Sequence, residues 1–421
     1  MISRSPELLA PAGSLHMMRS AFAFGADAVY GGMPRYSLRV RNNEFSRLET
    51  LSVAIEEAHA QQKPFYLVAN IYPHNAKIRT FENDIAPVVG LKPDALIVAD
   101  PGILMLVRER WPEMPVHLSV QANTTNYAAV RFWQSLGVKR IILSRELTLE
   151  EVAEIRNACP DIELEVFVHG ALCIAYSGRC LLSGYFNRRD SNQGSCTNAC
   201  RWDYKVHPHD NPAPPADARL LEESQRPGEL MPIEEDEHGT YVLNSRDLRA
   251  VEHVARLVDI GVDSLKIEGR TKSAYYAARA SQVYRRAIDA ARSGETFDPR
   301  LLDQLEGLAS RGYTGGFYVR RAPQQHQNYQ RGHSESSRSI LVGEVLALDG
   351  KECSALIEVK NAFAPGDRLE FVFPGGPVEG TAAVMTDETG KVVARAPGSG
   401  WRVRMTVPPQ VRLPCFITRF L

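Results

Sequence analysis

The chain has 421 residues, a formal net charge of −1, 44% hydrophobic residues and 24% charged residues, as is ordinary for a soluble globular protein. Its longest apolar runs, such as residues 95–99, are far shorter than the roughly 20 residues that cross a bilayer. The N-terminal residues also lack the apolar region of a secretory signal. These features disfavour a membrane or secreted protein and predict a cytoplasmic one, in which clustered cysteines are more often ligands than disulfides.

Short apolar runs alternate with amphipathic helical patterns over most of the chain. Eight strands are predicted, at residues 7–10, 26–30, 65–70, 95–99, 116–120, 140–143, 162–168 and 264–267. Helices are predicted between most of them, at residues 15–24, 48–61, 81–89, 103–109, 127–136 and 149–157. This alternation predicts a parallel (β/α)8 TIM-like barrel over residues 1–325, with a doubly wound open sheet as the alternative.

Glycines or hydrogen-bonding residues follow nearly every predicted strand. In (β/α)8 barrels the working groups lie at the C-terminal ends of the strands, so we expect these residues to line one polar pocket. Three of them, Arg145, His169 and Glu268, are candidates for catalytic acid–base and polar roles. For His169 the alternative is a structural histidine that bonds to a neighbouring backbone group.

Four of the seven cysteines lie in the cysteine-bearing segment, residues 165–200, with the spacing C-x6-C-x15-C-x3-C. They are Cys173, Cys180, Cys196 and Cys200. Thiolates bind zinc or iron–sulfur clusters, and only the last two cysteines have the close spacing of a zinc knuckle. A 4Fe–4S cluster is therefore favoured, with zinc and a redox or nucleophilic thiol as alternatives. The chain has no H-E-x-x-H or G-x-S-x-G motif, which disfavours a conventional hydrolase.

An insertion at residues 203–240 is rich in proline and charge, and we expect a long loop that adds a lid or a binding surface. A short strand at 241–243 and a helix from 246 to about 258 are predicted to lead into the eighth strand. Basic residues gather around the cysteines and the strand ends. Those expected to bind RNA phosphates or donor carboxylates are Arg39, Arg41, Arg188, Arg189, Arg201, Arg270 and Lys272.

The predicted secondary structure changes from helices to short strands at a polar linker, residues 320–337. Before it, helices are predicted at 274–293 and 301–309. After it, short strands separated by turns such as Asp349-Gly350 predict a small antiparallel β-barrel over residues 338–421. Small barrels of this kind often present a surface to RNA.

Residues 165–183 carry a family resemblance. They read Glu165-x-Phe167-x-x-Gly170-Ala171-Leu172-Cys173, four residues, then Gly178-x-Cys180-x-Leu182-Ser183. This pattern resembles the signature of the collagenase-like peptidase family of unknown mechanism. The stretches GADAVYGG, HLSVQAN, GSCTNACRW and SLKIEGRTKS are similar to those of the bacterial tRNA 5-hydroxyuridine modification proteins within it.

The resemblance implies an enzyme that hydroxylates C5 of the wobble uridine in a tRNA anticodon loop, without molecular oxygen. It also implies prephenate or a derived small molecule as donor, and a 4Fe–4S cluster on Cys173, Cys180, Cys196 and Cys200. An electron-donor protein is a further expected partner. The peptidase label of the family keeps a metal- or thiol-dependent peptidase as the alternative function.

Overall fold

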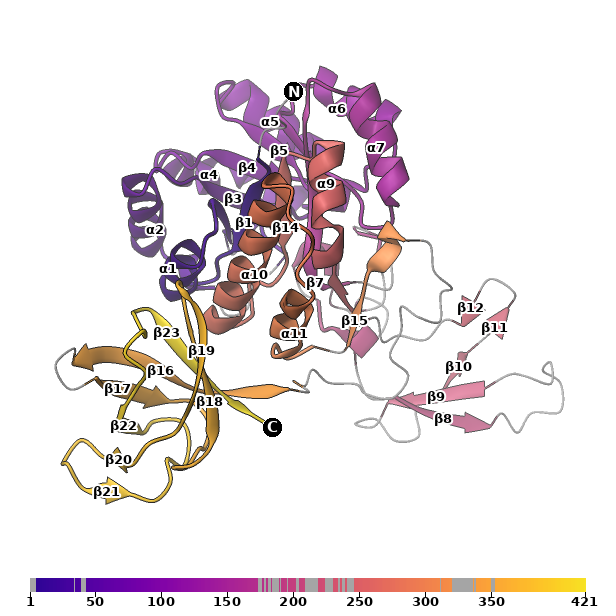
Figure 1. The fold of residues 1–421 in the computed structure, drawn as a ribbon. Helices are drawn as coiled ribbons and strands as arrows, with labels where there is room; N and C mark the ends of the chain where they lie inside the picture. Colours follow the sequence, from indigo (N-terminus) through magenta and orange to yellow (C-terminus); the bar gives the residue numbers. More distant parts are fainter. Residues whose placement is uncertain are drawn as a thin grey trace.

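The computed structural model describes residues 5–33, 35–38, 43–172, 176–177, 179–180, 183, 189, 191–194, 196–201, 204–208, 219–223, 230–233, 235–236, 239–240, 246–310, 312–319, 336, 338–349 and 353–421. Within them the chain forms a large barrel, a small sheet that projects from it and a separate C-terminal sheet (Figure 1). No helix among these residues has both the length and the apolar character needed to cross a membrane.

Eight parallel strands close into a barrel, because β14 pairs with both β7 and β1. The strands are β1 (Glu7–Pro11), β2 (Ala28–Gly32), β3 (Phe65–Ala69), β4 (Ala95–Val98), β5 (Val116–Leu118), β6 (Arg140–Ile142), β7 (Glu163–Ala171) and β14 (Ser264–Ile267). Each overlaps one of the eight predicted runs. The predicted (β/α)8 barrel is confirmed.

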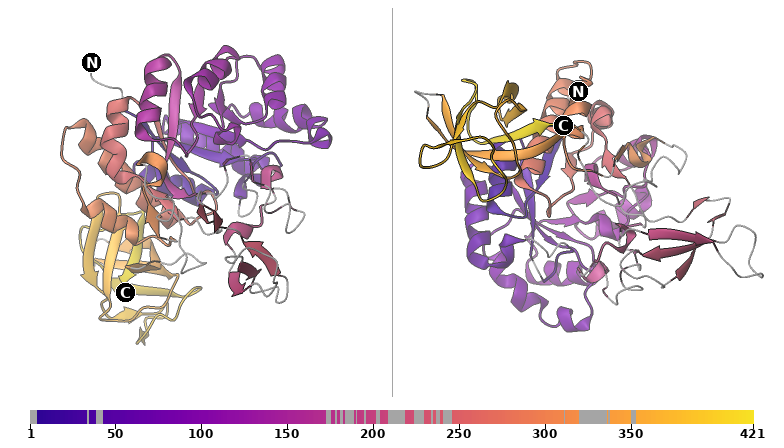
Figure 2. Two further views of the ribbon diagram at one scale, coloured as in Figure 1. Left: turned by 90° about the vertical axis from the view of Figure 1, so that its right-hand side faces the viewer. Right: turned by 90° about the horizontal axis from the view of Figure 1, so that it is seen from below.

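Helices surround the barrel, as the view from below shows (Figure 2). They are α1 (Leu15–Ala23), α2 (Leu48–Ala60), α3 (Asn75–Ile78), α4 (Phe81–Val89), α5 (Pro101–Arg110), α6 (Tyr127–Ser135), α7 (Leu149–Ala158), α9 (Val254–Ile260), α10 (Ala274–Arg292) and α11 (Arg300–Glu306). Side-chain caps determine where several begin. Thr148 and Glu151 form a capping box at α7, and the Tyr276 N–H donates to the Ser273 hydroxyl at the start of α10.

The helix predicted from residue 246 begins too early. Asp247–Arg249 instead form β13, which runs antiparallel to the end of β7 and parallel to β15 (Tyr313–Thr314). Helical turns begin only at η5 (Val251–His253), before α9. Because β7 continues beyond the barrel to Ala171, it offers backbone groups for pairing, and this tertiary contact overrides the local helical pattern. The strand predicted at 241–243 lies outside the described residues.

The insertion at 203–240, expected to be a long loop, contains short strands. β8 (Tyr204–Pro208), β9 (Arg219–Glu223) and β10 (Leu230–Ile233) form an antiparallel sheet. β11 (Glu235–Asp236) pairs with β12 (Gly239–Thr240). The register places Leu221 opposite both Val206 and Met231.

The C-terminal domain, residues 338–421, is an eight-stranded antiparallel sheet curled around its own core. Its strands are β16 (Ser339–Asp349), β17 (Ser354–Val359), β18 (Arg368–Phe373), β19 (Gly376–Thr381), β20 (Met385–Thr386), β21 (Val392–Val393), β22 (Arg402–Thr406) and β23 (Cys415–Phe420). Alternate residues of β17 and β22 are buried, which is the period-two pattern of a sheet with one face buried and the other exposed to solvent. The predicted antiparallel C-terminal domain is confirmed.

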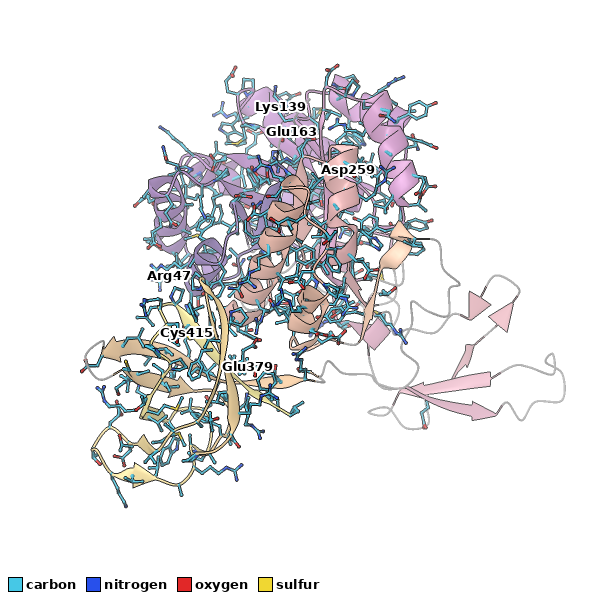
Figure 3. All side chains as sticks on the ribbon, in the orientation of Figure 1. Arg47, Lys139, Glu163, Asp259, Glu379 and Cys415 are labelled. Atoms are coloured by element: carbon cyan, nitrogen blue, oxygen red, sulfur yellow. The ribbon has the colours of Figure 1, made fainter. Side chains whose placement is uncertain are left out.

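The C-terminal domain packs on α10 and α1 through apolar and charged contacts. The Phe416 ring lies 5.7 Å from Tyr275 and 6.1 Å from Phe24, centroid to centroid. Gln282 Nε2 on α10 donates to the Phe373 carbonyl at 2.7 Å. In Figure 3, Lys139 and Glu163 mark the N-terminal ends of β6 and β7 at the top, so the strands run downward. The C-terminal ends of the eight strands, here called the mouth, therefore face the side of the C-terminal domain and the β8–β10 sheet.

Candidate functional site

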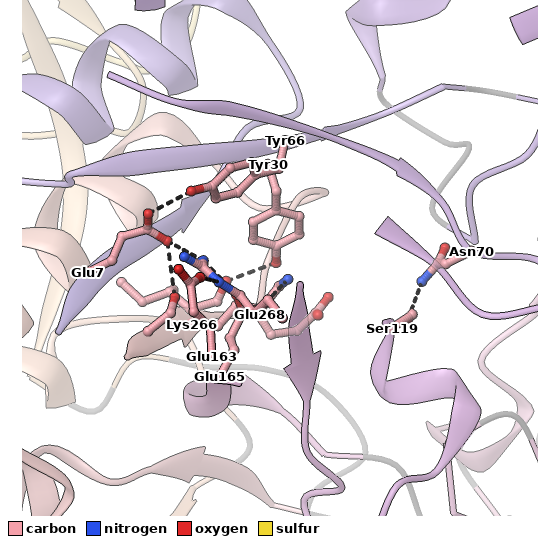
Figure 4. A network of polar contacts seen from close by, with 12 residues as sticks. Glu7, Tyr30, Tyr66, Asn70, Ser119, Glu163, Glu165, Lys266 and Glu268 are labelled. Atoms are coloured by element: carbon pink, nitrogen blue, oxygen red, sulfur yellow. Dashed lines mark hydrogen bonds and ion pairs between the residues drawn. The ribbon is translucent and has the colours of Figure 1, made fainter. Parts of the chain in front are cut away.

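Charged side chains fill the middle of the barrel, on the side of the mouth that is nearer the N-terminal ends of the strands. The inner layer consists of Glu7, Arg140, Glu165 and Lys266 from β1, β6, β7 and β14 (Figure 4). Arg140 Nη1 lies 2.6 Å from Glu7 and 3.2 Å from Glu165. Lys266 Nζ donates to Glu165 Oε1 at 2.7 Å, and neither side chain is more than 4% exposed. Arg140 also meets Glu163 at the N-terminal rim, at 2.8 Å.

Burial and pairing act against each other in the inner layer. Burial lowers the pKa of Lys266, while Glu165 raises it and limits the fall. Burial also disfavours the charged form of Arg140, but Glu7 and Glu165 outweigh it and the pKa of Arg140 is raised. Each charge in this layer has a close partner of opposite sign. Such a closed set of ion pairs is suited to holding strands together rather than to reacting.

A second set, the mouth cluster, lies at the strand ends and consists of Arg145, Glu268 and Arg270. Arg145 Nη2 is 3.4 Å from Glu268 Oε2, and the Arg145 guanidinium lies 3.9 Å from the Phe167 ring centroid. Arg270 Nη1 donates to Ser37 Oγ at 2.6 Å. The mouth cluster therefore presents two guanidinium groups and one carboxylate.

Tyr30 and Gly32 on β2 position this cluster. The Tyr30 ring lies 4.2 Å from Lys266 Nζ and 5.7 Å from Arg270 Cζ, between the two charged sets. Burial, followed by the nearby Glu268, raises the pKa of Tyr30 well above its ordinary value, so its hydroxyl keeps its proton. A Cβ on Gly32 would lie 2.0 Å from Arg270 Nη1. Only glycine at this strand end leaves room for the Arg270 guanidinium.

His169 does not join the mouth cluster. Phe167 pairs with Lys266, but the next pair joins His169 to Ile267, so β7 carries one extra residue at this point. This β-bulge reverses the alternation of side chains, and the His169 ring lies outside the barrel interior. The ring centroid is 5.5–5.6 Å from the rings of three tyrosines, Tyr276, Tyr284 and Tyr313.

Full burial lowers the pKa of His169 to about 3, so its ring is neutral at physiological pH. Its Nδ1 lies 3.4 Å from the Tyr284 hydroxyl, and its Nε2 meets no hydrogen-bond partner within the described part of the chain. The sequence grouped His169 with Arg145 and Glu268 as residues of one pocket. The structure brings Arg145 and Glu268 together and places His169 in an aromatic cluster between β7 and α10.

Uncharged polar groups continue the mouth over β3, β5 and β6. The Asn70 amide donates to the Ser119 hydroxyl at 3.0 Å. The Ser144 hydroxyl donates to Asn123 Oδ1 at 2.9 Å. These residues follow three different strands, as the sequence pattern predicted. They add hydrogen-bonding groups suited to a polar ligand such as a nucleobase.

The described part of the cysteine-bearing segment lies beside the loop that follows β3. The Tyr72 N–H donates to the Asn192 carbonyl at 3.1 Å, and the Gln193 amide donates to the Tyr72 carbonyl. The Cys180 carbonyl accepts hydrogen bonds from Ser191 at 2.8 Å and from Asn192 at 3.2 Å. These bonds hold the segment at the mouth.

Cys196 lies in a tight turn in which its sulfur meets two donors, the Asn198 N–H and the Ser183 hydroxyl, and one acceptor, Asn198 Oδ1 at 3.8 Å. Asn198 has a left-handed backbone (φ 57°), and its N–H donates to Cys196 Sγ at 3.4 Å. The Ser183 hydroxyl lies 3.9 Å from the same sulfur, and Cys200 follows in η4 (Ala199–Arg201). Hydrogen bonds to sulfur are a usual feature of metal-bound thiolates.

Within the described residues no group of three or more His, Cys, Asp or Glu lies within reach of one metal ion. Cys173 lies outside those residues. The four-cysteine ligand set therefore stays a prediction.

The basic residues expected to bind RNA or a donor are dispersed. Three lie outside the described residues: Arg39, Arg41 and Arg188. Arg270 belongs to the mouth cluster, and Lys272 Nζ, just before α10, lies 3.5 Å from the Ala309 carbonyl. Arg189 is exposed, and the backbone of Arg201 is part of η4.

The sequence interpretation assigned no role to the inner layer. The available signal was a charged residue between apolar neighbours in a strand, as at Glu165 and Lys266. A charge at such a position must point into the barrel or be paired elsewhere, because the opposite face of the strand packs on helices.

Two family models match the chain. Peptidase family U32 matches residues 13–328, and the peptidase family U32 C-terminal domain matches residues 337–417. The chain belongs to peptidase family U32. The resemblance drawn from residues 165–183 is thus confirmed. A solved U32 peptidase shares 14% sequence identity with this U32 chain, with a TM-score of 0.40 over 64% of this chain and 94% of that one.

Several curated relatives carry names that refer to RNA. The tRNA hydroxylation protein P of Escherichia coli K12 is 56% identical, over 97% of this chain and 95% of its own length. The protein of the same name in Haemophilus influenzae is 52% identical, over 97% and 94%. The 23S rRNA 5-hydroxycytidine C2501 synthase of E. coli is 30% identical, over 82% of this chain and 47% of its own length.

Proposed function

We propose that this U32 protein is a tRNA-hydroxylating enzyme that converts the wobble uridine of the anticodon loop to 5-hydroxyuridine. The observation that carries this proposal is the 56% identity to tRNA hydroxylation protein P of E. coli, which extends over 97% of the chain. The relative that makes 5-hydroxycytidine in 23S rRNA supports the same chemistry on RNA. A tRNA substrate implies a cytoplasmic enzyme.

The mouth is the proposed binding place for the base. An enzyme that modifies a base must take it out of its stack, and a single-stranded loop makes this easiest. The polar groups of Asn70, Ser119 and Asn123 follow β3 and β5 at the mouth, and Arg145, which follows β6, is stacked on Phe167. They match a pyrimidine, which presents hydrogen-bonding edges and a flat face.

Arg145 and Arg270 are the proposed site for the carboxylates of the oxygen donor, prephenate or a compound derived from it. Guanidinium groups bind carboxylates through two parallel hydrogen bonds. The 3.4 Å between Arg145 and Glu268 exceeds the ordinary range for a hydrogen bond between nitrogen and oxygen, so Arg145 can turn toward a ligand at small cost. Arg270, held by Ser37 at 2.6 Å, keeps its position.

Glu268 is the proposed proton acceptor. Hydroxylation forms a C–O bond at C5 of uridine as the bond between that oxygen and the donor breaks. The donor takes up two electrons, and the C5 hydrogen leaves as a proton. Glu268 is the carboxylate of the mouth cluster, and its side chain is 14% exposed, so a bound base can reach it.

Cys173, Cys180, Cys196 and Cys200 are the proposed ligands of a 4Fe–4S cluster, with zinc as the alternative. The chemistry of the donors fits a cluster, because the set is all thiolate and Cys196 Sγ accepts a backbone N–H at 3.4 Å. When bound, the cluster supplies one-electron transfer at the mouth, and an electron-donor protein is the proposed source of electrons. The backbone of the segment would hold the ligands beside the loop after β3.

The test is complementation of an E. coli strain that lacks tRNA hydroxylation protein P, grown without oxygen so that an oxygen-dependent route cannot contribute. We expect this chain to restore 5-hydroxyuridine in digested tRNA, measured by mass spectrometry, and the Cys196→Ala variant to fail. Iron and sulfide are expected in the protein purified without oxygen. Absence of the modified nucleoside with the intact chain would contradict the proposal. Stoichiometric zinc without iron would contradict the cluster.

The alternative function, a peptidase, has less support from the geometry. A thiol peptidase would need a histidine base near its nucleophile. The His169 ring is buried among three tyrosines and is neutral, with a pKa of about 3. A peptide-cleavage assay on the same preparation tests this alternative directly.

A further inference from the structure

A cavity of about 280 Å³ lies where the TIM barrel meets the C-terminal domain, and we name it the junction pocket. The start of α10 and the residues after α11 form one side of it, and β16 forms the other. Figure 1 shows α10 and α11 on the side of the barrel that is next to the C-terminal domain. The lining includes Lys272, Ser273, Tyr275, Gly307, Ser339 and Asn361.

The charge of this lining has one sign. Lys272 is the charged residue among the described residues that line the junction pocket, and no aspartate or glutamate is among them. Its Nζ lies 3.5 Å from the carbonyl of Ala309, which also lines the pocket, so the ammonium group is at the pocket wall. A lining that contains a cation and no carboxylate favours an anionic ligand.

The N-terminus of α10 adds to this positive character. The helix has 19 residues and no acidic residue in its first turn. The Ser273 hydroxyl accepts the Tyr276 N–H, whereas the Tyr275 N–H meets no acceptor within the described residues. The positive end of the helix dipole is therefore not offset by a carboxylate of its own first turn. Helix N-termini of this kind suit anions, and phosphate in particular.

The Tyr275 hydroxyl points to a ligand independently of the helix. Tyr275 is 5% exposed, and its hydroxyl meets no hydrogen-bond partner in the described part of the chain. Burial raises the pKa of Tyr275 although Arg279 lies nearby, so the hydroxyl keeps its proton at physiological pH. Arg279 cannot accept that proton, because a guanidinium only donates hydrogen bonds. The hydroxyl is therefore a buried donor whose acceptor is not among the described residues.

Gly307 shows that this hydroxyl faces the junction pocket. A Cβ added to Gly307 would lie 3.9 Å from the Tyr275 hydroxyl oxygen and 2.9 Å from Ser339 Oγ. Hydroxyls from α10 and β16 thus meet beside one residue of the pocket lining. The backbone of Gly307 has a φ of −69°, which any residue can adopt, so glycine here provides space rather than a special conformation.

We propose that the junction pocket binds a phosphate group. Lys272 supplies the charge, the first turn of α10 supplies a backbone N–H, and the hydroxyls of Tyr275 and Ser339 donate to the phosphate oxygens. A tetrahedral phosphate accepts hydrogen bonds from several directions, whereas a planar carboxylate is matched better by the paired nitrogens of arginine. Because the lining comes from both domains, a bound phosphate links the C-terminal domain to the barrel.

The phosphate has two possible sources, the backbone of a bound tRNA and a small phosphorylated molecule. Lys272 follows Arg270 of the mouth cluster by two residues, so the junction pocket is close to the mouth. A tRNA whose base enters the mouth brings its backbone phosphates to this side of the molecule. The tRNA source rests on the proposed function, whereas the small-molecule source does not.

The first experiment measures thermal unfolding of the full chain in inorganic phosphate and in chloride at the same ionic strength. For a dissociation constant of about 1 mM, about 20 mM phosphate should raise the melting temperature by about 2 °C. Tyr275→Phe and Lys272→Gln should each weaken phosphate binding by about 10-fold and remove more than half of that increase. In chloride, Tyr275→Phe should melt at the temperature of the intact chain or above it, because it removes a buried hydroxyl that has no acceptor.

The matched controls are Tyr127→Phe and Lys139→Gln, which make the same chemical changes at exposed positions away from the junction pocket. Both should keep the full increase in phosphate. Equal increases in the controls and the pocket variants would mean a general salt effect on folding and would overturn the proposal. So would the absence of any increase in the intact chain. A lower melting temperature of Tyr275→Phe in chloride would show that its hydroxyl has a structural partner, and would also overturn it.

The second experiment separates the two sources by measuring the affinity of the same proteins for a fluorescently labelled tRNA transcript. If the phosphate belongs to tRNA, Tyr275→Phe and Lys272→Gln bind the transcript more weakly than their controls do. If it belongs to a small molecule, tRNA affinity is unchanged while the phosphate effect on melting is still lost. Either result supports the junction pocket. The melting experiment does not involve tRNA modification, so failure to restore 5-hydroxyuridine would refute the proposed function without changing its outcome.

Discussion

The inner layer and the mouth cluster use the same kinds of residue on adjacent levels of one barrel, yet their ion pairs differ. In the inner layer Arg140 is shared by three carboxylates at 2.6–3.2 Å, and Lys266 is 2.7 Å from Glu165. In the mouth cluster Arg145 has one carboxylate contact within the described residues, at 3.4 Å. Arg140 in the inner layer is thus enclosed by carboxylates, whereas Arg145 at the mouth has a single long contact of this kind among the described residues.

This difference reflects how far each level is from solvent. A charge that is fully enclosed must be paired, because an unpaired one would cost several kcal/mol to desolvate. Glu165 and Lys266 are 0% and 4% exposed, whereas the side chains of Arg145 and Glu268 are 10% and 14% exposed; Glu7, at the N-terminal rim of the inner layer, is the exception at 17%. Residues nearer the mouth can therefore exchange a protein partner for a ligand.

The largest loss of stability is expected from Lys266→Met in the inner layer. After this substitution Arg140 is the only close cation of Glu165 in the described part of the chain. Arg140 also forms ion pairs with Glu7 and Glu163. We expect a loss of about 4 kcal/mol, as for other buried ion pairs from which one partner is removed. Urea denaturation measures it.

The control for that prediction is Arg368→Met on the surface of the C-terminal domain. The Arg368–Glu379 pair is closer, at 2.5 Å, but its side chains are 66% and 53% exposed. We expect a change below about 1 kcal/mol. Equal losses from the two substitutions would show that enclosure is not what separates the classes of ion pair.

An intermediate loss is expected from acid, through His169 on the outer side of β7. In the folded state the pKa of the His169 ring is about 3, whereas in the unfolded chain it is near 6.5. Because the unfolded state binds the proton first, the free energy of unfolding falls as the pH drops through this range. Between pH 8 and pH 5 this group should remove about 2 kcal/mol. The variant His169→Phe should lose that much less over the same interval, and an unchanged pH dependence would contradict the assignment.

The smallest loss of stability is expected from Arg145→Lys in the mouth cluster, below about 1 kcal/mol, because lysine keeps the charge and the ion pair with Glu268, at 3.4 Å, is long. Modification of tRNA should nevertheless fall by about 10-fold or more, since lysine keeps the charge but lacks the fork that binds a carboxylate through two bonds. Arg131→Lys is the matched control, because Arg131 also stacks on an aromatic ring, that of Tyr127, away from the mouth. Full activity of the Arg145 variant would remove this residue from the proposed donor site.

Much of the barrel could be predicted from local patterns. The eight strand runs and the helices between them depend on residues a few positions apart, which a sequence displays directly. The pairing of Arg145 with Glu268 at one mouth followed from their positions after two strands of the same barrel. The helix predicted from residue 246 was wrong because β13 owes its conformation to pairing with β7, a strand distant in the sequence.

The sequence by itself determined the fold class, the family and the polar character of the mouth, because periodicity and motif spacing are local properties of the chain. The tertiary structure decided the rest. One extra residue in β7 relative to β14 turns His169 from the barrel interior to a cluster of tyrosines. The enclosed pairing of Glu165 with Lys266, and the separation of the inner layer from the mouth cluster, also depend on contacts between strands about a hundred residues apart. Such contacts leave no periodic signal in the sequence, because each is set by the register of two distant segments.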